Sequence, residues 1–243
     1  MDNPTEAMQR KHTVHSFDEE LAELTGQIVR MGAHAEQQIA LALRALIERD
    51  DELAEQVIEA DQVVDRLEEE IDQHAIRMLA TRQPMAVDLR VIAMSLKLSN
   101  DLERISDYAK SIAKRSRRLS TAPPLKPFVT IPRMAATAQS MLKDVLDCYI
   151  ARDADKAMEV WHRDVTVDDQ YDSLFRELIT FILEDPRTTS TAIDLLFIAK
   201  NIERIGDLTT NMAEQVIYLV TGEMPDEARP KNDKTAYVTN LSQ

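Results

Sequence analysis

The sequence predicts an all-α protein made of two tandem, pseudo-symmetric three-helix bundles. The 243 residues include only 4 glycines, and aromatic residues make up 5% of the chain, which leaves little material for tight hairpins or strands. Long runs instead place apolar residues three and four positions apart, which is the period of an amphipathic helix. A proline-rich segment divides these runs into two halves, and the second half copies the first. We therefore expect six long helices.

The first bundle is expected at residues 17–118. Its first helix follows a polar, aperiodic N-terminal segment and ends at the capping residues Arg49-Asp50-Asp51. The second helix keeps a seven-residue apolar repeat from Leu53 to about Thr81. The third opens at Gln83-Pro84, where proline suits the first helical position, and continues to about residue 118.

Residues 119–131 are expected to form a linker, and residues 132–222 the second bundle. The linker region is rich in proline and has no helical period. The fourth helix ends at Arg152-Asp153, the fifth follows, and Asp185-Pro186 gives the sixth a strong N-cap with proline at its first position. Residues 223–243 show no period and are expected to be a disordered tail.

A short motif occurs twice and carries paired acids. Residues 101–107 read Asp-Leu-Glu-Arg-Ile-Ser-Asp, and residues 201–207 read Asn-Ile-Glu-Arg-Ile-Gly-Asp. Glutamate and aspartate stand four apart in both copies, so they project from one helical face. Like charges at this spacing destabilise a helix by roughly 0.2–0.5 kcal/mol in water. The repetition therefore indicates that something else offsets the repulsion.

A second acidic pair in each half is expected to face the first. Asp61 and Asp65 on the second helix match Asp164 and Asp168 on the fifth, again four apart. The pairs lie about 20 residues on either side of each interhelical turn, so at 1.5 Å per residue they are nearly level on antiparallel helices. Each half thus brings four carboxylates together. The expected metal ligands are Asp61, Asp65, Glu103 and Asp107 in the first half and Asp164, Asp168, Glu203 and Asp207 in the second.

Four facing carboxylates either take up protons, because their pKa values rise, or bind cations. Ligand sets made only of oxygen suit Mg, Mn, Ca or Fe(III) better than a structural zinc site. A single acidic pair is ordinarily a solvated surface feature, but four pairs repeated in register favour a metal site. We expect no catalytic residues and no organic cofactor, because the chain has neither a nucleophile arrangement nor a glycine-rich phosphate loop.

The overall charge and the cysteine content limit the possible functions further. A formal charge of −14 and a pI near 4.8 argue against nucleic acid as a partner. Cys148 is the one cysteine, so no disulfide framework is expected, which fits a reducing compartment. The sequence shows neither a signal region nor an apolar run of roughly 20 residues. We expect a cytoplasmic protein that meets a membrane only through partners.

The two motifs, the paired acids and the Leu-Glu-Asp-Pro-Arg turn at residues 183–187 resemble the PhoU family of phosphate-transport accessory proteins. The resemblance spans about residues 17–222. It implies metal clusters of Fe, Mn, Mg or Zn on both acidic surfaces and a regulatory role without catalysis. It also implies partners, namely a PhoR-type sensor histidine kinase and the phosphate ABC transporter ATPase PstB, and a homodimer. Family members repress the phosphate-starvation response when phosphate is plentiful.

One departure between the halves puts their equivalence in doubt. The second motif continues to Asn211, as is common in the family, whereas the first has Ser111 there, and Asp101 stands opposite Asn201. We therefore expect the two sites to differ in metal affinity or number.

Two other functions are open. The first is a metal-free helical adaptor, which explains the helices but not the acids that interrupt their apolar stripes. The second is a ferritin-like di-iron protein, which needs a Glu-x-x-His sequence from each of two helices. The chain has this sequence once, at Glu159 and His162, and Glu59 stands where the repeat would need a second histidine.

Overall fold

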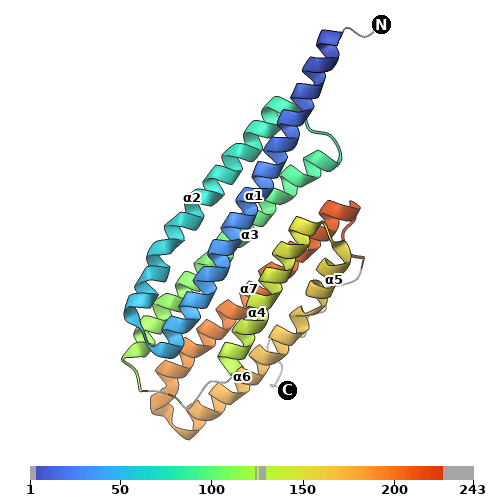
Figure 1. Ribbon diagram of the computed structural model, residues 1–243. Helices are drawn as coiled ribbons and strands as arrows, with labels where there is room; N and C mark the ends of the chain where they lie inside the picture. The colour runs from blue at the N-terminus through green and yellow to red at the C-terminus, as the bar shows by residue number, and fades with distance from the viewer. Residues whose placement is uncertain (1–3, 124, 126–129, 227–243) are drawn as a thin grey trace.

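The computed structural model describes residues 4–123, 125 and 130–226, and its regular elements within them are all helices. They are α1 (Pro4–Glu48), α2 (Asp51–Arg82), α3 (Val87–Ser120), α4 (Thr130–Ala151), α5 (Ala154–His162), α6 (Asp164–Glu184), the 3₁₀ helix η1 (Pro186–Thr188) and α7 (Thr189–Thr221). The expected all-α class is confirmed. Figure 1 shows α1 to α3 as one set of long helices, with α4 to α7 beside it.

The two halves pack against each other along α3 and α7. Gln215 of α7 donates a hydrogen bond to Asp101 of α3 at 2.6 Å, and Arg115 of α3 donates to Asp194 of α7 at 2.9 Å. The higher-numbered residue of one helix thus meets the lower-numbered residue of the other, so α3 and α7 are antiparallel (Figure 1). The apolar cores of the two three-helix units join across this contact.

A second contact between the halves is made by α1 and α4 and includes a close approach at a glycine. A Cβ atom built on Gly32 would lie 2.6 Å from a methyl carbon of Leu146. A larger residue at position 32 would therefore require the Leu146 side chain to move. The duplicated units share one packed interior, because apolar residues of α1 and α3 face the other half as well as their own.

The helix ends repeat from one half to the other. Arg49 and Arg152 both have positive φ, at 57° and 55°, which closes α1 and α4 with a left-handed residue. Asp50 then caps α2 by accepting a hydrogen bond from the Leu53 amide at 2.9 Å, and Asp153 caps α5 in the same way from Lys156 at 3.0 Å. The predicted cap at Asp50 is confirmed, whereas Asp185, the predicted cap of the sixth helix, accepts from the Arg187 amide at 3.1 Å and caps the 3₁₀ helix η1 that leads into α7.

Three elements differ from the expectation. First, α1 begins at Pro4, well before Phe17. Proline suits a first helical turn, and the intervening residues include many good helix formers, so a helix already nucleated can extend without an apolar stripe. Second, Pro84 does not open α3, which starts at Val87 after Gln83 has ended α2 with a φ of 49°.

The third difference is a break in the expected fifth helix, which is divided into α5 and α6 at Arg163. The Arg163 amide donates to the carbonyl of Val160 at 3.0 Å, and the Thr166 amide donates to that of Arg163 at 3.0 Å. Both bonds span three residues, so the chain tightens locally into a 3₁₀ turn. Apolar residues seven apart lie on either side, and their spacing does not reveal the break.

Parts of two further expectations lie outside the described residues. The linker expected at 119–131 includes residues 124 and 126–129, and the tail expected at 223–243 includes residues 227–243, none of which is described. Among the described helices, none combines the length and apolar character needed to cross a bilayer.

Candidate functional site

The first acidic cluster lies where α2 packs on α3. Asp61 is buried, with 2% of its surface exposed, and it accepts a hydrogen bond from the Ser106 hydroxyl at 3.0 Å. The same hydroxyl also contacts the side-chain amide of Gln38 of α1, and its single proton serves one of these two acceptors at a time. The second acidic pair is thus level with the motif on α3, as the turn arithmetic predicts.

Lys110 brings a positive charge into this first cluster. Its ammonium group forms an ion pair with Asp61 and lies 3.6 Å from a carboxylate oxygen of Asp107. The hydrogen bond to Asp61 raises the pKa of Lys110, because the carboxylate stabilises the charged form. A buried carboxylate in the first half is therefore neutralised by a side chain of the chain itself.

The remaining acids of the first cluster are closer to water. Asp65 and Asp107 are exposed, and Glu103 is half-buried. Desolvation raises the pKa of Asp65, and the charge of Asp61 adds to the rise. Desolvation likewise raises the pKa of Glu103, followed by the charges of Asp107 and Asp65. These shifts show that the four carboxylates lie near enough to repel one another.

The second cluster lies where α6 packs on α7 and is more deeply buried. The exposed fractions are 1% for Asp164, 5% for Asp168 and 6% for Glu203. The Thr210 hydroxyl donates a hydrogen bond to Asp164 at 3.1 Å. Asp207 is half-buried and completes the set of four expected ligands.

Glu203 is buried, and its two carboxylate oxygens have different surroundings. One of its carboxylate oxygens accepts a hydrogen bond from Lys200 at 2.8 Å, but the other is buried and has no hydrogen-bond partner among the described residues. Desolvation raises the pKa of Glu203, while Lys200 opposes the rise. A buried carboxylate oxygen without a donor is costly, so this atom is a place where a cation would stabilise the structure.

The second cluster has more buried carboxylates than the first, and carboxylate oxygens are the groups that hard cations prefer. Asp172, one turn beyond Asp168, also has a buried oxygen without a hydrogen-bond partner in the described part of the chain. Within the described residues, however, no three His, Cys, Asp or Glu side chains stand in positions that could hold a metal ion. Metal binding there would therefore require side-chain rotation, which is common when a ligand binds.

Sequence reasoning missed the groups that surround the acids. Ser106, Lys110 and Thr210 contact them, Gln38 contacts Ser106, and Asp172 extends the acidic face. A signal was present for two of these residues, because Lys110 and Thr210 occupy the same position after the two motifs. Asp172 also continues the four-residue spacing of Asp164 and Asp168.

The geometry does not favour a di-iron centre at Glu159 and His162. Both side chains are exposed on the surface of α5, whereas a di-iron site in a helical bundle is built from residues that project into its core.

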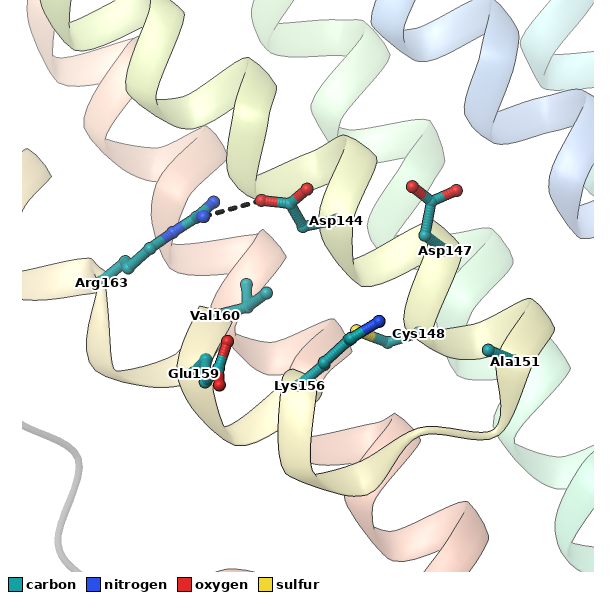
Figure 2. Close-up of a pocket in the computed structure, with 8 residues that line it drawn as sticks. All are labelled: Asp144, Asp147, Cys148, Ala151, Lys156, Glu159, Val160 and Arg163. Carbon is teal, nitrogen blue, oxygen red and sulfur yellow. Dashed lines mark hydrogen bonds and ion pairs between the residues drawn. The ribbon is translucent and has the colours of Figure 1, made fainter.

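A cavity of about 340 Å³ lies between α4 and α5 and is separate from the eight predicted ligands. Figure 2 shows Arg163 reaching across to Asp144, with which it forms an ion pair at 2.7 Å, while Lys156 and Glu159 lie on the α5 side. Cys148 lines the cavity, but burial raises the pKa of its thiol and keeps it protonated. The cavity therefore has neither a reactive nucleophile nor a uniform charge.

We expect the metal-free protein to be more stable near pH 5 than at pH 7.5. Carboxyl groups with a raised pKa, such as Glu103 and Glu203, bind more protons in the folded protein than in the unfolded chain. The free energy of unfolding therefore increases as the pH falls through their folded pKa values. Below about pH 4 the trend reverses, because Arg82 lowers the pKa of Glu20 by hydrogen bonding and that contribution is lost on protonation. The melting temperature at each pH, measured by circular dichroism in the presence of a chelator, tests this expectation. A melting temperature that falls steadily from pH 7.5 to 5 would contradict it, and the variant Glu203→Gln should show a weaker rise.

Comparison with known proteins identifies the family. The PhoU domain matches twice, at residues 28–116 and 131–216. The phosphate-specific transport system accessory protein PhoU homolog of Caulobacter vibrioides is 47% identical over 224 residues, covering 92% of this chain and 97% of that protein. The homolog of Rhizobium meliloti is 45% identical, covering 97% of this chain and all of its own length.

Solved structures agree with this match. The crystal structure of PhoU from Pseudomonas aeruginosa superposes with a TM-score of 0.83 at 39% identity, covering 85% of this chain and 100% of that one. The structure of the phosphate transport system regulatory protein PhoU from Streptococcus pneumoniae gives 0.81 at 30% identity, covering 87% and 100%. A domain matched twice, and relatives matched over nearly their whole length, leave one conclusion: this chain is a member of the PhoU family.

Proposed function

We propose that this chain is a cytoplasmic negative regulator of phosphate uptake and of the phosphate-starvation response. It acts by contact between the phosphate ABC transporter, through the ATPase PstB, and a PhoR-type sensor histidine kinase. It functions as a homodimer and reaches the membrane only through these partners.

The observation that carries the proposal is the duplicated, acid-bearing three-helix unit, which matches the PhoU domain in both halves. The relatives named above are described as accessory proteins of phosphate-specific transport, and the chain matches them over almost their full length. An accessory role in the phosphate transport system follows from this membership.

The chain is not an enzyme, since its family consists of accessory rather than catalytic proteins. Within the described residues, the strongest chemical feature is a set of mutually repelling carboxylates. A function exerted through binding and surface charge suits such a molecule.

We place the metal of the proposed regulator at the paired carboxylates, of which the second-half set fits best. Asp164, Asp168, Glu203 and Asp207 would hold it, and a hard cation such as Mn²⁺ or Fe³⁺ would supply positive charge to the buried Glu203 oxygen that has no hydrogen-bond partner among the described residues. The metal would fix the packing of α6 on α7. It is thus assigned a structural and regulatory role.

One observation favours a metal-free adaptor as the second candidate. Lys110 already neutralises Asp61 in the first half without any metal. If an internal cation can stabilise that cluster, the contact surface for partners can exist without bound ions.

Deleting the gene in its own host is expected to leave the phosphate-starvation genes switched on in phosphate-rich medium. Restoring the wild-type gene should silence them again, and tagged protein should capture PstB or the sensor kinase. The test is the expression of a reporter for the phosphate-starvation genes at high phosphate, measured in a strain without a paralogous copy of the gene. Normal silencing in the deletion strain would refute the regulatory role.

Complementation with the variant Glu203→Ala/Asp207→Ala separates the two candidates. A metal-dependent regulator fails to silence the genes at equal protein level, whereas a metal-free adaptor still silences them. The matched control is Asp155→Ala/Glu159→Ala, because these acids are also four apart but are exposed on α5. That control should silence the genes like wild type.

A further inference from the structure

A groove of about 470 Å³ lies where α2 and α3 run side by side, and one residue of α7 also borders it (Figure 1). It is separate from the eight predicted metal ligands. Its walls combine carboxylates with apolar side chains, and they include Glu68, Asp72, Ile76, Leu96, Lys97 and Asp101. The groove therefore has an acidic part and an apolar part.

The acidic end of the groove is formed by Glu68 and Asp72 of α2. These residues stand four apart, so their carboxylates project from one helical face, and both are half-buried. Desolvation raises the pKa of Glu68, and the charge of Asp72 adds to the rise. With the buried Asp101, the groove has three acids against one lysine, the exposed Lys97. This end therefore favours a positively charged partner.

The other end of the groove is apolar and lies toward the turn between α2 and α3. Ile76 lines the groove although 60% of its surface is exposed. Leu79 stands three residues after Ile76 and continues the same face of α2. Leu89 stands seven before Leu96 and continues the same face of α3, while Met85 in the turn is 79% exposed. Large apolar side chains gathered in water at one place indicate a contact surface.

We infer that this α2–α3 groove is the docking surface for a partner protein. Its occupant is an amphipathic segment of that partner, with arginine at the Glu68 and Asp72 end and apolar side chains at the Ile76 and Leu89 end. The inference rests on the contact function proposed above. It adds the place of the contact and the direction in which the bound segment lies.

The chemistry of the two ends selects this occupant. A guanidinium group presents a planar fork of N–H donors to carboxylates, and it is weakly hydrated, which suits acids that are already partly desolvated. Apolar side chains on the same segment cover the apolar end, as in other helix-in-groove contacts. A dissolved metal ion would leave the apolar end in water. An anionic lipid surface would be repelled by the acids.

Charge reversal tests the acidic end. The full-length chain is titrated against purified PstB and against the cytoplasmic part of the sensor kinase, and binding is measured by biolayer interferometry. For whichever protein binds wild type, Glu68→Lys/Asp72→Lys should weaken binding by on the order of a hundredfold, because attraction to the arginine becomes repulsion. The matched control Glu69→Lys/Glu70→Lys makes the same change in net charge at exposed positions of α2. It should stay within about threefold of wild type.

Truncation tests the apolar end in the same binding measurement. Ile76→Ala/Leu89→Ala should weaken binding by about tenfold, because less apolar surface is removed from water in the complex. The matched control is Ile150→Ala/Ile193→Ala, since these isoleucines are 53% and 43% exposed but lie on α4 and α7. All the replaced side chains are exposed or half-buried, so the variants should fold, which their circular dichroism melting curves check.

The controls separate failure of this inference from failure of the proposed function. Wild-type affinity in either groove variant would overturn the inference and leave the contact function standing. Equal losses in the groove variants and their controls would overturn it too, because the effect would then not depend on the groove. Altered self-association in sedimentation experiments, with partner binding intact, would assign the groove to a second copy of the chain instead. If wild type binds neither protein, the contact function fails and the inference fails with it.

Discussion

Replacing Trp161 with alanine is expected to lower the free energy of unfolding by about 3–5 kcal/mol. The indole is 1% exposed, and its nitrogen donates a hydrogen bond to Glu214 of α7 at 2.9 Å. The substitution removes a large apolar contact between α5 and α7, leaves a cavity that packed neighbours fill only in part, and takes away the donor to Glu214. Since domains are typically stable by about 5–15 kcal/mol, this is a substantial share of the total.

Urea unfolding followed by far-ultraviolet circular dichroism measures the loss, because Trp161 is the single tryptophan and the variant has no indole fluorescence. Trp161→Phe should lose less, as it keeps an aromatic ring. Ile150→Ala is the matched control, since Ile150 is 53% exposed and its truncation should stay within about 0.5 kcal/mol. A loss below about 1 kcal/mol for Trp161→Ala would show that α5 does not depend on this contact.

Replacing Lys110 with methionine is expected to destabilise the metal-free protein by about 3 kcal/mol. Removing one partner of a buried ion pair leaves an uncompensated charge, which costs about 3–5 kcal/mol, and here the lower end applies because Lys110 is 26% exposed to solvent. Methionine keeps the length of the aliphatic stem, so packing changes little. Asp61 then keeps the hydrogen bond from Ser106 but loses the ammonium group.

The double variant Asp61→Asn/Lys110→Met should recover most of this stability, because it removes the buried charge together with its partner. Lys114→Met serves as the control, since Lys114 is an exposed lysine one turn further along α3. Chemical unfolding in the presence of a chelator compares the four proteins. If Lys110→Met and Lys114→Met were equally stable, the ion pair with Asp61 would not matter for folding.

The sequence alone was enough to predict the helices, the duplication and the positions at which the acidic residues of neighbouring helices lie side by side. Helical periodicity and N-caps are local properties, so the caps at Asp50 and Asp153 could be placed from residue types. The rise of 1.5 Å per residue is fixed, so counting from the turn was enough to bring Asp61 beside the first motif. The break at Arg163 and the early start of α1 were missed, because neither changes the apolar spacing.

Only the tertiary structure decided which acids are buried and what neutralises them. The eight acids look alike in sequence, yet Asp164 and Glu203 are buried while Asp65 and Asp107 are exposed. Burial depends on the rotation of each helix against neighbours from both halves, and the packing of α3 on α7 was not visible in either repeat alone. A long side chain such as Lys110 can reach several partners from one backbone position. The packed neighbours around it bring it to Asp61 and Asp107, so the difference between Lys110 and Thr210 can be interpreted only in the folded protein.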